Sequence, residues 1–185
     1  MKNQSITEAM LQFIEDSPTA FHAAANVEAL LLENGFEKLE NLAEGALVPG
    51  GSYYTMQNGS AVLAVKIPEN PAKGFRIAAS HSDSPCFKIK EVPEMKVENT
   101  YVKLNVEKYG GMILSPWLDR PLSVAGRVFV AGKDGKPEVK LVNLKKDLLI
   151  IPNVAIHFNR EINNGFAYNP HCLLYTSDAA DDMQC

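Results

Sequence analysis

The spacing of apolar residues at the start of the chain predicts two helices. The first carries an apolar stripe at helical spacing, formed by Ile6, Met10, Phe13 and Ile14. Ser5 and Glu8 fit a capping box that begins this helix, and the helix is expected to end before Ser17–Pro18. Ser17 then fits the N-cap, and Pro18 the first position, of a second helix. Asn34–Gly35 predicts the end of that second helix.

The pattern then changes to short strands. Residues 53–56 and 61–67 read as a hairpin, because the Asn58–Gly59 pair between them is typical of a type I′ turn. Residues 75–79 are apolar with small side chains, which predicts a buried central strand packed close to helices. This strand would end at residues 80–85. Ligand groups gather at the carboxyl ends of strands in open α/β sheets, so the chemistry is expected there.

The rest of the chain is mostly β in pattern. Strands are predicted at residues 101–107, 124–130 and 139–144, with a turn at Gly132–Gly135 between the last two. The segment Glu91–Glu98 contains Pro93 and alternating charges, and is the expected boundary between the two parts. The pattern therefore predicts an α/β part over residues 1–91 and a β-rich part after it.

Composition narrows the class of protein. The 185 residues are 46% hydrophobic and 22% charged, as in a globular protein, and no apolar run is long enough to cross a bilayer. The net charge of −4 does not suggest a nucleic-acid partner. Three cysteines are too few for a disulfide framework. We therefore expect a cytoplasmic protein with no nucleic-acid and no membrane partner.

The C-terminal residues 172–185 differ from the rest. From Cys172 the sequence resembles the in-frame translation of a transposase-type sequencing adapter, so this tail is interpreted as non-native and set aside. The tail holds three acidic residues, no basic residue, and both Cys172 and Cys185. The native part is therefore nearly neutral and has Cys86 as its one cysteine.

His81 and Asp83 are the first candidates for chemistry. Neutral imidazole is a good zinc ligand, and a neighbouring carboxylate can fix its tautomer and direction. A separation of two residues in an extended segment places both side chains on one side of the backbone. Asp83 could therefore contact His81 or a second metal ion, and the spacing does not choose between them.

Several motifs in order along the chain resemble the aspartyl aminopeptidase family, metallopeptidase family eighteen. These segments are residues 13–22 (FIEDSPTAFH), 80–86 (SHSDSPC), 106–111 (VEKYGG), 117–122 (WLDRPL), 125–128 (AGRV) and 151–160 (IPNVAIHFNR). The resemblance covers about residues 10–170. It implies a zinc aminopeptidase with an α/β catalytic domain, two metal ions, and a β-rich dimerisation domain inserted in it, assembling into homo-oligomers, typically dodecamers. Manganese or cobalt could replace zinc.

By the same resemblance, His81 is a metal ligand and Asp83 is the acidic neighbour that orients it. His157 would lie on the inserted domain and reach the active site of an adjacent subunit, where it would bind substrate and stabilise the transition state. The family's other metal ligands and its catalytic Glu lie in a second half that this chain lacks. Residues 1–91 would then be the first segment of the catalytic domain, in two helices and a mixed sheet, and 92–171 an incomplete insertion.

The resemblance implies hydrolysis of N-terminal residues, with a leaning to Asp or Glu, from peptide substrates. A catalytic zinc needs about three protein ligands, so the fragment itself is expected to be inactive. Two alternatives stay open. Another co-catalytic di-zinc hydrolase, a deacetylase or dipeptidase, also uses His-x-Asp, although residues 117–122 and 151–160 favour the aminopeptidase. The second alternative is a non-catalytic oligomerisation fragment.

Other residues have simpler interpretations. His22 is a satisfied helix residue, Cys86 a small buried hydrophobe rather than a nucleophile, and residues 109–111 a glycine-dependent turn. Trp117 is a packing anchor, with Asp119 and Arg120 as an ion pair. Without the resemblance, His157 would be read as a core or interface residue, because residues 154–158 are mostly apolar.

Overall fold

The structure is a computed structural model that describes residues 5–40, 47–70 and 74–165. The chain divides into two compact units: one comprises Met1–Ser84 with Val124–Lys145, and the other Pro85–Ser123 with Lys146–Cys185. These compact units do not test the assignment of residues 1–91 to a catalytic domain and of residues 92–171 to an insertion, which stays a prediction. The tail at residues 172–185 lies outside the described residues.

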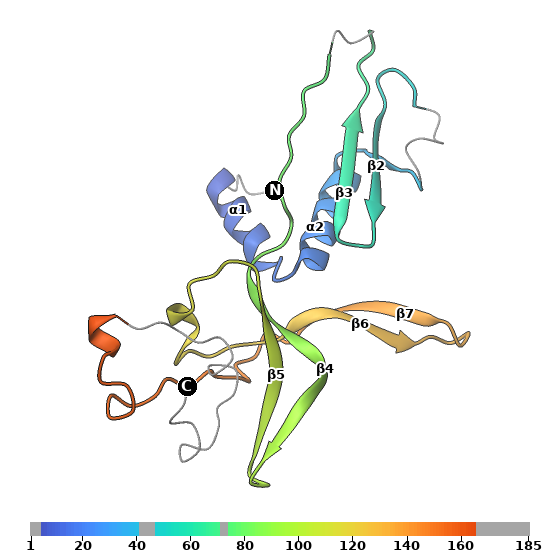
Figure 1. Cartoon of the computed structure of the whole chain (residues 1–185). Helices are drawn as coiled ribbons and strands as arrows, with labels where there is room; N and C mark the ends of the chain where they lie inside the picture. The colour runs from blue at the N-terminus through green and yellow to red at the C-terminus, as the bar shows by residue number, and fades with distance from the viewer. Residues whose placement is uncertain (1–4, 41–46, 71–73, 166–185) are drawn as a thin grey trace. The chain divides into compact units, whose positions relative to one another are not determined.

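Two helices open the first unit, as expected (Figure 1). Helix α1 spans Ile6–Glu15, and its capping box is present: the Glu8 N–H donates to Ser5 Oγ, and the Ser5 N–H donates to Glu8 Oε2. Helix α2 spans Ala20–Glu33 and ends at Asn34–Gly35, where Gly35 has a φ of 76°. That left-handed residue is the predicted helix stop.

The predicted start of α2 is wrong by two residues. The N-cap is Thr19, not Ser17, and Pro18 lies outside the helix. Thr19 has an extended backbone, and its side chain accepts from the His22 N–H, which satisfies one of the free donors of the first turn. The Ser17 hydroxyl is engaged elsewhere, since it accepts a hydrogen bond from Asn26 Nδ2 at 3.0 Å.

A three-stranded mixed sheet follows, in the order β1–β2–β3. Its strands are β1 (Glu37–Lys38), parallel to β2 (Ser52–Gln57), and β3 (Ala61–Lys66), antiparallel to β2. Asn58 and Gly59 both have positive φ, of 53° and 68°, which agrees with the predicted type I′ turn. In the part of the chain that the structure describes, the buried residues are few and come from α2 and β2: Ala23, Ala24, Tyr53, Tyr54 and Thr55.

The predicted buried strand at residues 75–79 is wrong. These residues follow an extended path with no strand assigned, and Phe75 and Ile77 are 89% and 87% exposed (Figure 1). No strand among the described residues pairs with this segment. A strand needs partners for its backbone groups, so local apolar character alone does not make one.

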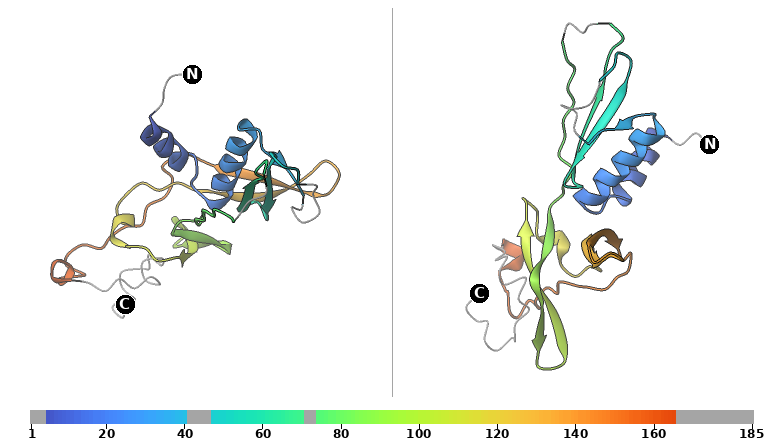
Figure 2. Two further views of the ribbon diagram at one scale, coloured as in Figure 1. Left: turned by 90° about the horizontal axis from the view of Figure 1, so that it is seen from above. Right: turned by 90° about the vertical axis from the view of Figure 1, so that its right-hand side faces the viewer.

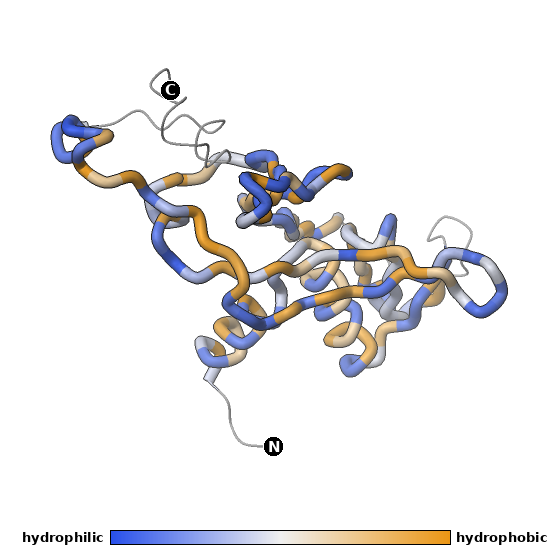
Figure 3. The backbone as a smooth tube through the Cα atoms, turned by 90° about the horizontal axis from the view of Figure 1, so that it is seen from below, coloured by the Kyte–Doolittle hydropathy of each residue, from blue (hydrophilic) through white to orange (hydrophobic). Residues whose placement is uncertain are grey.

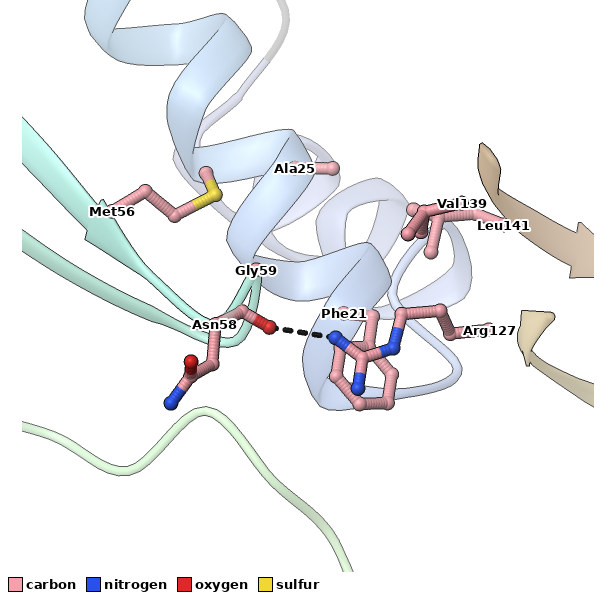
Figure 4. A pocket seen from close by; sticks show the side chains of 8 residues that line it. All are labelled: Phe21, Ala25, Met56, Asn58, Gly59, Arg127, Val139 and Leu141. Carbon is pink, nitrogen blue, oxygen red and sulfur yellow. Dashed lines mark hydrogen bonds between the residues drawn. The ribbon is translucent and has the colours of Figure 1, made fainter. Parts of the chain in front are cut away.

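The hairpin β6–β7 completes the first unit. Strand β6 (Ala125–Ala131) pairs antiparallel with β7 (Pro137–Asn143) around the predicted turn at Gly132–Gly135. Arg127 of β6 links this hairpin to the rest of the unit. Its guanidinium lies 4.0 Å from the centre of the Phe21 ring and donates to the Asn58 carbonyl at 2.7 Å (Figure 4).

The second unit is built on the hairpin of β4 (Cys86–Val97) and β5 (Tyr101–Tyr109). Strand β4 covers all but the last residue of Glu91–Glu98, the segment that was expected to be a boundary. Its register shifts between Ile89 and Glu94. Pro93 lies in this irregularity, where a missing backbone N–H does least harm to the ladder.

The remainder of this unit is short 3₁₀ turns and bridges. Helix η1 (Ser115–Trp117) carries Trp117, whose ring meets Phe87 of β4 edge to face at 5.1 Å, as a packing anchor should. Leu118 forms a parallel bridge with Ile151, and Leu122 an antiparallel bridge with Leu149. Helix η2 spans Ile162–Asn164.

Apolar and polar residues alternate along much of the backbone, as the hydropathy-coloured tube shows (Figure 3). Many large apolar side chains nevertheless remain exposed, among them Val92 at 77% and Ile113 at 75%. The described helices are too short and too polar for any of them to cross a membrane. The views in Figure 2 show α2 beside β2 and β3, where the buried residues are concentrated.

A polar network ties α2 to the sheet. Glu28 of α2 accepts from Lys38 Nζ at 2.7 Å and from the Tyr54 hydroxyl at 3.0 Å. The hydrogen bond from Lys38 is the main reason why the pKa of Glu28 is lowered, and it also raises the pKa of Lys38. Burial, followed by the hydrogen bond to Glu28, raises the pKa of Tyr54.

We expect Glu28→Gln to lower the free energy of unfolding by about 1 kcal/mol at pH 7. A lowered carboxyl pKa stabilises the fold above its ordinary value of 4.5, and that contribution is lost as the pH falls through the folded-state pKa. Urea unfolding at pH 7 and at about pH 3 measures the difference. Glu33→Gln, at the exposed end of the same helix, is the control. A Glu28→Gln effect that does not shrink in acid would contradict this account.

We expect Arg127→Ala to destabilise the first unit by about 1–2 kcal/mol, because it removes a charge-assisted hydrogen bond and a cation–π contact. Arg127→Lys should recover part of this loss, since it keeps the charge but not the planar group. The matched control is Arg76→Ala, in the exposed 74–79 segment. Equal effects of Arg127→Ala and Arg76→Ala on urea unfolding would disprove the role of Arg127.

Candidate functional site

His81 and Asp83 lie together on the extended segment that follows residues 75–79. The Nδ1 atom of His81 is 3.0 Å from Asp83 Oδ1 and 2.9 Å from the Asp83 carbonyl oxygen. The spacing had left open whether Asp83 contacts His81, and the structure shows that it does. Nearby, the Ser82 hydroxyl donates to the Ser60 carbonyl at 2.9 Å, which joins this segment to the end of the β2–β3 turn.

This arrangement leaves one ring nitrogen of His81 available. Asp83 occupies the Nδ1 side, so Nε2 is the atom that could coordinate a metal ion. The His81 side chain is 82% exposed, whereas that of Asp83 is 42% exposed. The geometry is that of a histidine whose tautomer and ring direction are fixed by a carboxylate, the pattern found behind many metal-ligating histidines.

The described residues do not complete a metal centre. No group of three or more His, Cys, Asp or Glu side chains in residues 5–40, 47–70 and 74–165 is placed to hold an ion. A catalytic zinc site needs about three protein ligands and an open position. The donor chemistry of His81 therefore fits one ligand of a zinc site, and the other ligands would have to come from outside the described part of the chain.

His157 belongs to the second unit and lies in an exposed turn. The Phe158 N–H donates to the Ala155 carbonyl at 2.8 Å, which closes the turn around His157. Val154, Ile156 and Phe158 are 55%, 52% and 69% exposed. A core role for His157 is therefore wrong, and its role at an interface or a site stays a prediction.

Three other sequence interpretations are decided by the structure. His22 is hydrogen-bonded within its own helix, since Nδ1 lies 2.8 Å from Oγ1 of the N-cap residue Thr19, and burial lowers its pKa. The expected Asp119–Arg120 ion pair is absent among the described residues; Asp119 Oδ1 instead accepts from the Asn153 N–H at 2.8 Å. Gly110 has a φ of 78°, which confirms a turn that needs glycine.

A cavity of about 350 Å³ lies elsewhere in the first unit (Figure 4). Its walls come from α2, the β2–β3 hairpin and the β6–β7 hairpin, and they are mostly apolar. The one charged side chain in the lining is Arg127, which already contacts Phe21 and the Asn58 carbonyl. The cavity presents no nucleophile or metal ligand, so the candidate site remains His81 and Asp83.

Sequence reasoning missed two contacts that shape the molecule. The bond from Arg127 to Asn58 spans 69 positions, and the bond between Asp119 and Asn153 spans 34. Only the second contact had a signal in the sequence, which is the residue type at position 119. Asp is one of the few residues that readily adopt a positive φ, and the structure gives Asp119 a φ of 53°.

Comparison with known proteins supplies the context for this site. The profile of the aminopeptidase I zinc metalloprotease (M18) family matches residues 13–176. A protein of Clostridium acetobutylicum named Probable M18 family aminopeptidase 2 is 48% identical over 174 residues. That match covers 92% of this chain and 40% of the relative, so the chain spans less than half the length of that relative.

Solved structures agree with the sequence matches. A chain of the Ape4 and Nbr1 complex superimposes with a TM-score of 0.80 at 36% identity, over 87% of this chain and 31% of that one. The mApe1 dodecamer of S. cerevisiae gives a TM-score of 0.75 at 28% identity, over 83% and 36% of the two chains. These matches confirm the α/β fold class expected from the sequence. The chain belongs to the M18 family of zinc metallopeptidases, the aminopeptidase I family.

Proposed function

We propose that the chain is the N-terminal part of a zinc-dependent aminopeptidase that removes N-terminal residues from peptides, with a preference for Asp or Glu. The observation that carries this proposal is the contact between His81 Nδ1 and Asp83, which prepares Nε2 for a metal ion. It occurs inside the segment matched by a zinc metallopeptidase family. The preference for acidic residues rests on the resemblance alone.

In this proposal, His81 supplies one ligand and Asp83 orients its ring. A bound zinc ion would supply Lewis-acid activation of water and of the scissile carbonyl. Two ions are expected by resemblance, with manganese or cobalt as alternatives. A general base would remove the proton of the attacking water. That base and the remaining ligands are expected in a segment beyond this chain, so the chain alone is proposed to be inactive.

His157 is proposed to act at the active site of an adjacent subunit, where it binds substrate and stabilises the transition state. Its exposure, together with the apolar side chains around it, supports a residue presented to a partner rather than to a core. The S. cerevisiae relative is a dodecamer. A homo-oligomer of the same kind, located in the cytoplasm and with peptides as substrates, is the corresponding proposal for this protein.

Residues 1–91 are proposed to be the first segment of the catalytic domain and residues 92–171 an incomplete dimerisation insertion. Two alternatives lead to different expectations. Another di-zinc hydrolase, a deacetylase or dipeptidase, would keep His81 and Asp83 but act on a different bond. A non-catalytic assembly module would need neither residue.

We expect the purified chain to bind zinc weakly, with less than one ion per chain, and to show no peptidase activity, because one histidine and its neighbour make too few ligands. Equilibrium dialysis with metal analysis measures the binding. His81→Ala should abolish it, while His22→Gln, on α2, should leave it unchanged. Tight binding of two zinc ions by this chain would contradict the proposal.

We expect the protein encoded by the extended open reading frame to hydrolyse aspartyl and glutamyl peptide substrates. His81→Ala should abolish most of its activity, and Asp83→Asn should lower it about 10- to 100-fold, in line with the loss of a carboxylate behind a ligand. Activity on acetylated substrates in place of aminoacyl substrates would favour the deacetylase. Full activity of His81→Ala would refute a metal role for this residue.

A further inference from the structure

Asp119 makes two hydrogen bonds to the segment that leads into the His157 turn. Its backbone N–H donates to the Ile151 carbonyl at 2.9 Å, and its side-chain Oδ1 accepts from the Asn153 N–H at 2.8 Å. Asp119 therefore bonds to both Ile151 and Asn153, which are two residues apart in the same segment. All of these residues belong to the second unit.

The backbone conformation of Asp119 explains why a side chain makes the second bond. Leu118 and Ile151 form a parallel bridge, and a regular parallel ladder would continue with a backbone carbonyl accepting the next N–H. Asp119 leaves extended geometry, with a φ of 53°, and its carboxylate accepts instead. Asp and Asn are the side chains that both tolerate this conformation and offer such an oxygen.

Further hydrogen bonds fix the residues between Asn153 and His157. The Val154 N–H donates to Asn153 Oδ1 at 2.9 Å, and the turn closed by Ala155 and Phe158 follows directly. Pro152 has no N–H to place. The backbone N–H groups of Asn153 and Val154 both donate to side-chain oxygens rather than to a neighbouring strand.

We infer that Asp119 is a positioning residue for His157. Its carboxylate acts as a clamp: it accepts the Asn153 N–H and so fixes the start of the segment that carries the His157 imidazole. The turn itself is exposed, with Ile156 half-exposed and Phe158 mostly exposed, so burial does little to hold it. The hydrogen bond from Asn153 to Asp119 orders this segment in place of side-chain packing. This inference rests on the proposed role of His157 in substrate binding, and it assigns that role a second residue far away in the sequence.

Amide hydrogen exchange of this chain tests the clamp without any assay of activity. Asp119→Ala should raise the exchange rate of the Asn153 N–H about tenfold or more, because the bond to a charged acceptor is lost. Asp119→Asn keeps both the oxygen and the tolerance for positive φ but not the charge, so its rate should lie closer to the wild-type rate than to that of Asp119→Ala. Asp119→Gly keeps the conformation without the oxygen, and should behave as Asp119→Ala does. Unchanged exchange in Asp119→Ala and Asp119→Gly would overturn the clamp.

Activity of the protein from the extended reading frame tests the link to His157. Asp119→Ala should lower kcat/KM about tenfold, Asp119→Asn should restore it, and Asp119→Ala combined with His157→Ala should be no worse than His157→Ala alone. An impaired His157→Ala with a fully active Asp119→Ala would overturn the positioning role only. A fully active His157→Ala would overturn the proposed role of His157 itself, and with it this inference.

Discussion

The need of every backbone N–H and C=O group for a partner governs this structure. Residues 75–79 have the composition of a central strand, but no described strand lies beside them to accept their hydrogen bonds. They remain extended and exposed, and the segment with His81 and Asp83 continues from them. The candidate ligand is therefore ordered by side chains within its own loop, chiefly Asp83, rather than by a surrounding sheet.

The same shortage of neighbours explains why polar contacts matter so much here. Among the described residues, the buried ones are a short stretch of β2 and two alanines of α2. Around this small core, Glu28 connects α2 to Tyr54, and Arg127 connects the β6–β7 hairpin to α2 and the β2–β3 turn.

Local signals in the sequence predicted local structure well. The capping box at Ser5, the turn at Asn58–Gly59 and the stop at Gly35 all form as expected, because each depends on residues within a few positions. The start of α2 was misplaced because Ser17 and Thr19 are both good caps, and Asn26 engages Ser17 from a distance. The strand at 75–79 failed for a non-local reason, the absence of a pairing strand in the described residues. For the site, spacing brought His81 and Asp83 together as a candidate pair, whereas their metal role rests on the family.

The irregularity in β4 has a consequence for how the second unit meets other chains. Pro93 lies in an otherwise long strand, and it removes a donor just where the register shifts. The charged residues Glu91 and Glu94 lie close to it. Pro93 offers no backbone N–H to a ladder at this point of β4. Proline and charged side chains are among the features that keep strand edges from pairing with other chains, and β4 carries both.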